Sequence, residues 1–167
     1  MQKLIVSVLL GITFLVTGCG VYSHTGASVP PDASTVSVAY LTNMASIINP
    51  LLSQTMGEKL RQKFVNETPL KLTSADADLM FSGKILTYEI RPAAVQGNQT
   101  NALNRLTISV EIIFENKKAV DKNFTKTFSN NIDFNASDNF QTREAELSGK
   151  VVDMLVQDIF NAAFINW

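Results

Sequence analysis

The sequence predicts an α+β fold: a two-layer sandwich with a four-stranded antiparallel or mixed sheet and two helices on one face. Three observations support this prediction. Two segments repeat apolar residues every three or four positions, as amphipathic helices do. Three long segments alternate apolar and polar residues, as half-buried strands do, and the elements follow one another in the order βαβββα. An antiparallel sheet offers one apolar face, on which both helices can bury their apolar stripes.

The first strand and the first helix are expected between residues 35 and 66. Residues 35–41 alternate, with Val36, Val38 and Tyr40 on one face. Asn49-Pro50 is expected to open the helix, because Asn is a favoured N-cap and Pro is tolerated in the first turn. An apolar stripe then predicts the buried face of this helix; it consists of Leu52, Met56, Leu60 and Phe64.

Three further strands are expected between residues 79 and 134. In residues 79–95 the apolar residues change parity, from Phe81 and Ile85 to Tyr88 and Ile90. This change predicts either a β-bulge or a strand that is covered on both faces. A polar loop over residues 94–103 precedes a strand at 105–115, and after a charged turn residues 123–134 alternate again.

The last helix is expected to run from about residue 143 to residue 161 or beyond. Its apolar stripe is unusually wide; it consists of Leu147, Val151, Leu155, Ile159 and Ala162, widened by Val152, Val156, Phe160 and Ala163. Such a helix either buries more surface than one sheet face requires or faces a partner. The apolar residues 164–167 are expected to dock on the domain, because a solvated terminus seldom ends on Trp.

The first 20 residues predict export and lipid attachment. Lys3 precedes an apolar run, residues 4–16, that is too short to span a bilayer and has the proportions of a secretory signal. Val16-Thr17-Gly18-Cys19 resembles a bacterial lipobox, which implies cleavage between Gly18 and Cys19 and a diacylglycerol and an N-acyl chain on Cys19. The alternative is an ordinary signal with an incidental cysteine. A single cysteine cannot form an internal disulfide, however, and acylation explains its presence in an exported protein.

The predicted organisation is a signal peptide (1–18), a lipidated tether (19–34) and one domain (35–167). The net charge is −1 and becomes −2 when the signal, with Lys3, is removed. This balance argues against a nucleic-acid partner. Gly20, rather than Asp, follows Cys19, which resembles the sorting pattern of outer-membrane lipoproteins and implies anchoring at the periplasmic face.

The motifs for catalysis are missing, and we expect neither an enzyme nor a metal or cofactor site beyond the covalent lipid. His24 is the single histidine and lies in the tether. Asp76 and Asp78 are either a calcium ligand pair or turn residues, and turn chemistry is favoured because no further acidic ligands follow. Glu111 and Glu115 share one strand face, where solvated carboxylates are favoured over an acid–base pair.

Several segments resemble the LptE family of lipopolysaccharide-assembly lipoproteins, in particular a branch found in Bacteroidetes-type bacteria. These segments are Gly18-Cys19-Gly20-Val21-Tyr22-Ser23, Gly26-Ala27-Ser28, Leu60-Arg61-Gln62-Lys63-Phe64 and Ala102-Leu103-Asn104-Arg105-Leu106-Thr107-Ile108. The resemblance implies a lipoprotein that sits inside, and plugs, an LptD-like outer-membrane β-barrel. There it would assist barrel assembly and the insertion of lipopolysaccharide into the outer leaflet.

Three basic residues are predicted to meet the partner. Arg91 and Arg105 flank the loop at residues 94–103, and Lys84 lies upstream of Arg91. We expect them to contact the barrel or the lipopolysaccharide phosphates; the alternative is that each is a solvated surface charge. Two other functions stay open. One is a free periplasmic lipoprotein that binds lipid or glycolipid in an apolar cavity between sheet and helices. The other is an accessory of another secretion barrel.

Overall fold

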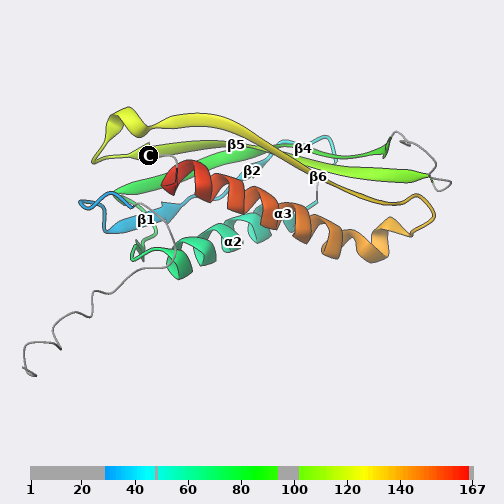
Figure 1. Ribbon diagram of the computed structural model, residues 1–167, viewed down its shortest axis with the longest axis horizontal. Helices are drawn as coiled ribbons and strands as arrows, with labels where there is room; N and C mark the ends of the chain where they lie inside the picture. The colour runs from blue at the N-terminus through cyan, green and yellow to red at the C-terminus, as the bar shows by residue number, and fades with distance from the viewer. Residues whose placement is uncertain (1–28, 48, 94–101, 166–167) are drawn as a thin grey trace, which may run out of the picture.

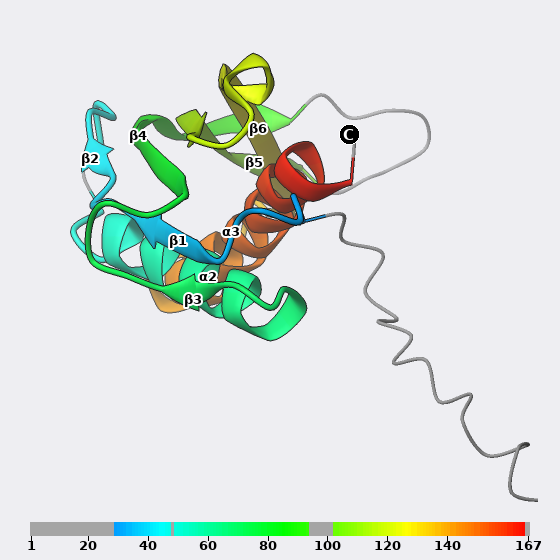
Figure 2. The ribbon, with the colours of Figure 1, turned by 90° about the vertical axis from the view of Figure 1, so that its left-hand side faces the viewer.

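The computed structural model describes residues 29–47, 49–93 and 102–165, and it has two layers (Figure 1). Helices α2 and α3 cover one face of a mixed sheet, which confirms the predicted α+β sandwich (Figure 2). In chain order the elements are β1 (Thr35–Val38), β2 (Thr42–Asn43), α2 (Leu52–Glu67), β3 (Lys71–Leu72), β4 (Leu79–Ala93), β5 (Leu103–Asn116), the 3₁₀ turn η2 (Val120–Lys122), β6 (Phe124–Asn135) and α3 (Phe140–Phe164).

The sheet has the strand order β3-β1-β4-β5-β6, and β2 pairs separately with β4. The three long strands β4, β5 and β6 form an antiparallel meander, whereas β1 and β2 run parallel to β4 and β3 runs parallel to β1. The sheet therefore has six strands among the described residues, where the sequence predicts four. The two additional strands, β2 and β3, have two residues each, too few to show an alternating pattern.

The first strand is shorter than predicted, and the prediction for Tyr40 is wrong. Val36 and Val38 are buried as expected, but Tyr40 is 70% exposed. The strand ends at Val38, after which the N–H of Ala39 donates to the carbonyl of Phe81 at 2.8 Å and the chain turns away. Leu41, which is fully buried, takes the inward position instead.

A β-bulge in β4 explains the change of parity in this strand. The register against β5 shifts between Ile85 and Thr87, which leaves Leu86 as the extra residue. Ile85 is buried before the shift and Tyr88 after it, so β4 keeps its apolar side chains on the helix-covered face. The predicted bulge is confirmed.

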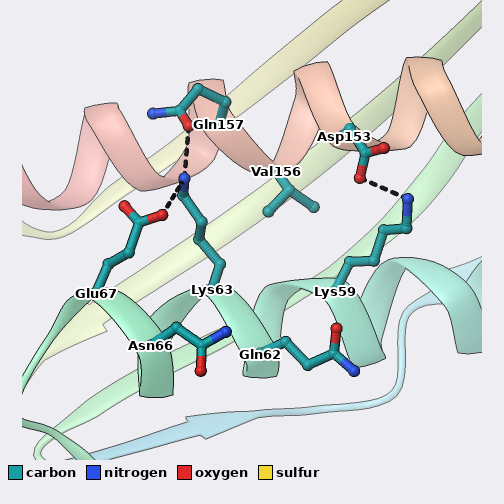
Figure 3. A pocket seen from close by; sticks show the side chains of 8 residues that line it. All are labelled: Lys59, Gln62, Lys63, Asn66, Glu67, Asp153, Val156 and Gln157. Atoms are coloured by element: carbon teal, nitrogen blue, oxygen red, sulfur yellow. Dashed lines mark hydrogen bonds and ion pairs between the residues drawn. The ribbon is translucent and has the colours of Figure 1, made fainter.

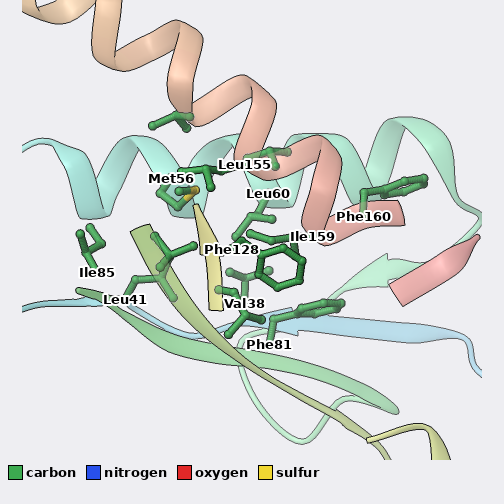
Figure 4. Close-up of a cluster of buried hydrophobic side chains, with 14 of the residues drawn as sticks. Val38, Leu41, Met56, Leu60, Phe81, Ile85, Phe128, Leu155, Ile159 and Phe160 are labelled. Atoms are coloured by element: carbon green, nitrogen blue, oxygen red, sulfur yellow. The ribbon is translucent and has the colours of Figure 1, made fainter. Parts of the chain in front are cut away.

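The core fills the space between the sheet and the helices (Figure 4). The predicted stripe of α2 is buried throughout, and α3 packs against both α2 and the strands β5 and β6, which accounts for its wide apolar stripe. Phenylalanine rings join the layers: the Phe64 and Phe81 centroids lie 4.5 Å apart, and those of Phe81 and Phe114 lie 4.8 Å apart. At the end of α3, Phe164 is fully buried and Ile165 is 48% exposed, while residues 166 and 167 lie outside the described residues.

Asp78 fixes the start of β1 against the start of β4. Its Oδ2 atom accepts hydrogen bonds from the backbone N–H groups of Ser34 (2.9 Å) and Thr35 (3.1 Å) and from both of their hydroxyls. These donors, above all the Ser34 N–H, hold the pKa of Asp78 well below its usual range. Asp76 instead pairs with Lys117. Asp76 has a positive φ of 55°, as turn residues do, whereas the long-range contacts of Asp78 with Ser34 and Thr35 are not predicted from the sequence.

Candidate functional site

The helices cover one face of the sheet (Figure 2), and we call the opposite face the open sheet face. Its residues alternate with the core residues along the three long strands. The polar ones near its centre and at the end close to the 94–101 gap are Lys84, Thr87, Glu89 and Arg91 from β4, Arg105, Thr107, Ser109 and Glu111 from β5, and Thr127, Ser129, Asn131 and Asp133 from β6. Toward the other end the same face also carries the apolar residues Met80 and Ile113. Hydroxyls meet across strands at its centre, where Ser109 Oγ and Ser129 Oγ lie 2.8 Å apart. The central part of the face therefore offers many hydrogen-bonding groups.

The three basic residues singled out from the sequence all lie on the open sheet face, and each has a carboxylate beside it. Lys84 Nζ lies 3.0 Å from Glu111 Oε1, and Arg91 Nη2 lies 2.9 Å from Glu89 Oε2. Two parallel hydrogen bonds join the Arg105 guanidinium to Asp133, at 2.6 and 2.8 Å.

The β4–β5 register places Arg91 directly opposite Arg105, whereas Lys84 lies farther back, before the bulge. Like charges opposite each other in a sheet repel, so the two carboxylate partners are needed to hold this arrangement. The guanidinium of Arg105 lowers the pKa of Asp133. The three basic residues and their partners are neutral as a group. Their contact with a partner molecule stays a prediction.

A polar cleft of about 340 Å³ lies between the two helices (Figure 3). Its two lysines are both paired: Lys59 with Asp153, and Lys63 with Glu67 and with the Gln157 side-chain oxygen at 2.6 Å. Lys59 also donates a hydrogen bond to the Gly149 carbonyl. Three contacts therefore join α2 to α3: Lys59 with Asp153, Lys59 with Gly149, and Lys63 with Gln157. We interpret the cleft as a helix–helix contact, because its cations already have partners.

A second and larger cavity, of about 730 Å³, opens where the first turns of α2 and α3 meet β4. We call it the groove; its principal lining residues are Ile47, Leu51, Tyr88, Ile90, Phe140 and Glu144. Ile47 and Leu51 are 55% and 67% exposed, whereas Tyr88 is 3% exposed. The lining is mostly apolar, in contrast to the open sheet face.

One carboxylate lies in the groove. Glu144 Oε1 accepts a hydrogen bond from the Tyr88 hydroxyl at 2.7 Å and one from Asn49 Nδ2 at 2.9 Å. Burial, together with the bond to Glu144, raises the pKa of Tyr88. The groove is not predicted from the sequence. The only sequence signal for it was the pair of apolar residues Ile47 and Leu51, which fall outside the stripe of α2.

The described residues contain no cluster of three or more His, Cys, Asp or Glu side chains that could hold a metal ion. None of the described helices is both long and apolar enough to cross a bilayer. Glu111 is paired with Lys84, and Glu115 on the same face is exposed. The predicted cleavage and lipidation site at Gly18 and Cys19, together with His24, lies outside the described residues.

Taken together, these features define an α+β domain with helices on one sheet face and a polar, open second face. The chain belongs to the LptE family, described as lipopolysaccharide-assembly, whose family model matches residues 33–163. The match covers almost the whole expected domain and confirms the resemblance to the LptE family. The function of the protein therefore falls within lipopolysaccharide assembly.

Solved structures share the fold at low sequence identity. A minor lipoprotein from Acinetobacter baumannii is 15% identical, with a TM-score of 0.51 over 77% of this chain and 91% of that one. An uncharacterized lipoprotein B from Nitrosomonas europaea is 13% identical, with a TM-score of 0.53 over 80% and 82%. PelC from Paraburkholderia phytofirmans, a dodecamer, is 10% identical, with a TM-score of 0.50 over 83% and 94%. No curated protein matches the chain.

Proposed function

We propose that the protein is the lipid-anchored subunit of an outer-membrane lipopolysaccharide translocon, sitting inside and plugging an LptD-like β-barrel whose assembly it assists. Acyl chains on Cys19 would hold it at the periplasmic face of the outer membrane. In this role the protein acts through its shape and surface and makes or breaks no bond. Membership of the LptE family supports the proposal at the level of lipopolysaccharide assembly.

The observation that carries the proposal is the open sheet face. The lumen of an outer-membrane barrel is polar, so a plug must present hydrogen-bonding groups without unpaired charges. Thr107, Ser109 and Thr127 supply such groups. The basic residues of this face are compensated by neighbouring carboxylates, as in the Lys84–Glu111 and Arg105–Asp133 pairs. Where these pairs lie, the face can rest against a polar wall without leaving a cation unpaired.

We assign Lys84, Arg91 and Arg105 to contacts with the barrel wall rather than with lipopolysaccharide phosphates. Glu111, Glu89 and Asp133 already offset the charges of the three cations, which weakens their attraction for a phosphate. Polar groups of a barrel wall can hydrogen-bond to the intact pairs.

A second candidate function is that of a free periplasmic lipoprotein that binds lipid or glycolipid, and the groove is the observation that favours it. The groove is large enough for part of a small ligand. Two observations weigh against an anionic glycolipid: the centre of the sandwich is packed, and Glu144 would repel a phosphate.

The test is purification of the acylated protein from outer membranes in mild detergent, with identification of the proteins that accompany it. We expect a large β-barrel in stoichiometric amount, and loss of surface lipopolysaccharide when the protein is depleted. Ser109→Arg places an unpaired charge at the centre of the open sheet face and should lower barrel recovery tenfold or more. Gln54→Arg, on the exposed side of α2 and next to Glu58, is the matched control and should leave recovery unchanged.

Two results would contradict the proposal. Recovery of the wild-type protein without any barrel would remove the plug function, and recovery with a barrel of another secretion system would make the protein an accessory of that system. Equal recovery of the barrel by Ser109→Arg and wild type would show that the open sheet face is not the contact surface.

A further inference from the structure

We infer that the groove and the adjoining edge of β4 form a docking site for an extended, positively charged segment of a partner protein. The edge arises because β4 continues past β2 (Figure 1). The last backbone contact on that side is the Met44 N–H donating to the Ile85 carbonyl at 2.9 Å. Beyond the bulge, from Thr87 to Ala93, β4 pairs only with β5 among the described strands.

An unpaired strand edge presents N–H and C=O groups to which an extended peptide can add as a further strand. Pro92 fits the end of such an edge, because proline has no N–H to donate and is found in sheets mainly at edges. The residues between the bulge and Pro92 therefore form a short template of about five residues. Main-chain hydrogen bonds to this template would supply affinity that does not depend on the sequence of the partner.

The groove can accommodate side chains of the added partner strand. In an added strand every second side chain points toward the helix side of the sheet, where Tyr88 and Ile90 form the floor of the groove. Ile47 and Leu51 lie at its rim and are more than half exposed. Apolar side chains of the partner would cover these exposed surfaces, which gives the site a preference for alternating apolar residues.

Glu144 determines the charge of the occupant. Its two hydrogen-bond donors, Tyr88 and Asn49, are neutral, and no Lys or Arg among the described residues forms an ion pair with it. The neighbouring Arg143 is already engaged by Asp138 and Glu146. A partly buried carboxylate without a cation is complementary to a Lys or Arg side chain and repels anionic lipid. The site therefore fits a cationic strand better than a phospholipid or a lipopolysaccharide phosphate.

This docking site is separate from the open sheet face, and the inference does not depend on which barrel the protein meets. The probe is the synthetic peptide acetyl-Ser-Ile-Thr-Lys-Thr-Ile-Ser-amide, in which the two Ile and the Lys fall on one face. The comparison peptide has Glu in place of Lys. Both are titrated against the full mature, acylated protein in lipid nanodiscs by isothermal titration calorimetry. Hydrogen exchange of the β4 segment is followed by mass spectrometry.

We expect the Lys peptide to bind at least tenfold more tightly than the Glu peptide and to slow amide exchange in residues 86–93. Glu144→Gln, which keeps an acceptor for Tyr88, should reduce the preference for Lys to less than threefold. Glu146→Gln is the matched control: it lies two residues away on α3, already pairs with Lys150, and should leave the preference unchanged. Thermal melting of each variant checks that it is folded.

Three outcomes would overturn the inference. The first is equal binding of the two peptides to the wild-type protein, or no binding of either up to about 1 mM. The second is binding without slower exchange in β4, which would mean that the edge is not used. The third is displacement of the Lys peptide by phosphatidylglycerol added to the nanodisc, which would identify the groove as a lipid site. Because the first two need only the wild-type protein, a variant that fails to fold does not affect the test.

Discussion

Gly83 and Gly149 should respond to alanine substitution with stability changes of opposite sign. At Gly83, in β4, an added Cβ would lie 2.0 Å from the carbonyl oxygen and 3.1 Å from the carbonyl carbon of Glu111 in the neighbouring strand. Both atoms are backbone, so relief requires β5 to move away from β4, which strains the ladder of hydrogen bonds between them. Overpacking of this kind costs about 1–3 kcal/mol.

Gly149 lies in the middle of α3, where the nearest atom to an added Cβ is Lys59 Nζ at 4.0 Å. Alanine is favoured over glycine in a helix interior by about 0.5–1 kcal/mol. For a domain of this size 1 kcal/mol corresponds to roughly 2–4 °C in melting temperature. Gly83→Ala should therefore lower the melting temperature by about 2–12 °C, and Gly149→Ala should raise it by about 1–4 °C.

Thermal melts followed by circular dichroism, together with urea titrations, measure both changes in the same preparation. A Gly83→Ala variant as stable as the wild type would contradict this prediction, because the β4–β5 approach would then be looser than the structure shows. Shifts of the melting temperature in the same direction for both substitutions would contradict it as well.

Three further predictions concern the anchor, the acid dependence and the core. Cys19→Ser should abolish incorporation of radiolabelled palmitate and release the protein from membranes; label on the variant would contradict lipidation at this residue. The folded-state pKa of Asp78 is lowered, so its contribution to stability is present above its unfolded pKa of about 3.9 and is lost as the pH falls toward the folded-state pKa. Asp78→Asn should therefore flatten the fall in melting temperature below about pH 5, whereas Asp121→Asn, an exposed carboxylate in the η2 turn, should not. Phe81→Ala should lower the unfolding free energy by about 3–5 kcal/mol in urea titrations, since Phe81 is 1% exposed and contacts Phe64; a loss below 1 kcal/mol would mean that the site collapses around the cavity.

The helices and long strands could be predicted because their signals are local. The apolar stripe of Leu52, Met56, Leu60 and Phe64 lies within one helix, and all four residues are buried. The β4 bulge was visible as a change of parity within one segment. By contrast, β2 exists only because Thr42 and Asn43 lie beside Lys84 and Ile85, some 40 positions away. Nothing within a two-residue segment shows such pairing.

The candidate surfaces depended still more on distant residues. The flanking positions of Arg91 and Arg105 indicated that they would lie near each other, and the register confirms it. Their neutralisation could not be predicted, because Asp133 reaches Arg105 from a third strand. The groove is formed by three segments, around Ile47, Tyr88 and Glu144. None of the three is unusual in isolation, so only the tertiary arrangement shows that a carboxylate lies in an apolar cavity.

The Asp78 contacts lie at one end of β4, and the groove residues Tyr88 and Ile90 lie near the other. At about 3.3 Å per residue, and with the bulge residue Leu86 left out, the strand separates them by roughly 30–36 Å. The length of β4 thus sets the distance between the start of β1, which Asp78 holds, and the mouth of the groove. Insertion of two residues in β4 would increase this distance by about 7 Å and keep every side chain on its own face of the sheet. Insertion of one residue would move the side chains that follow it to the opposite face.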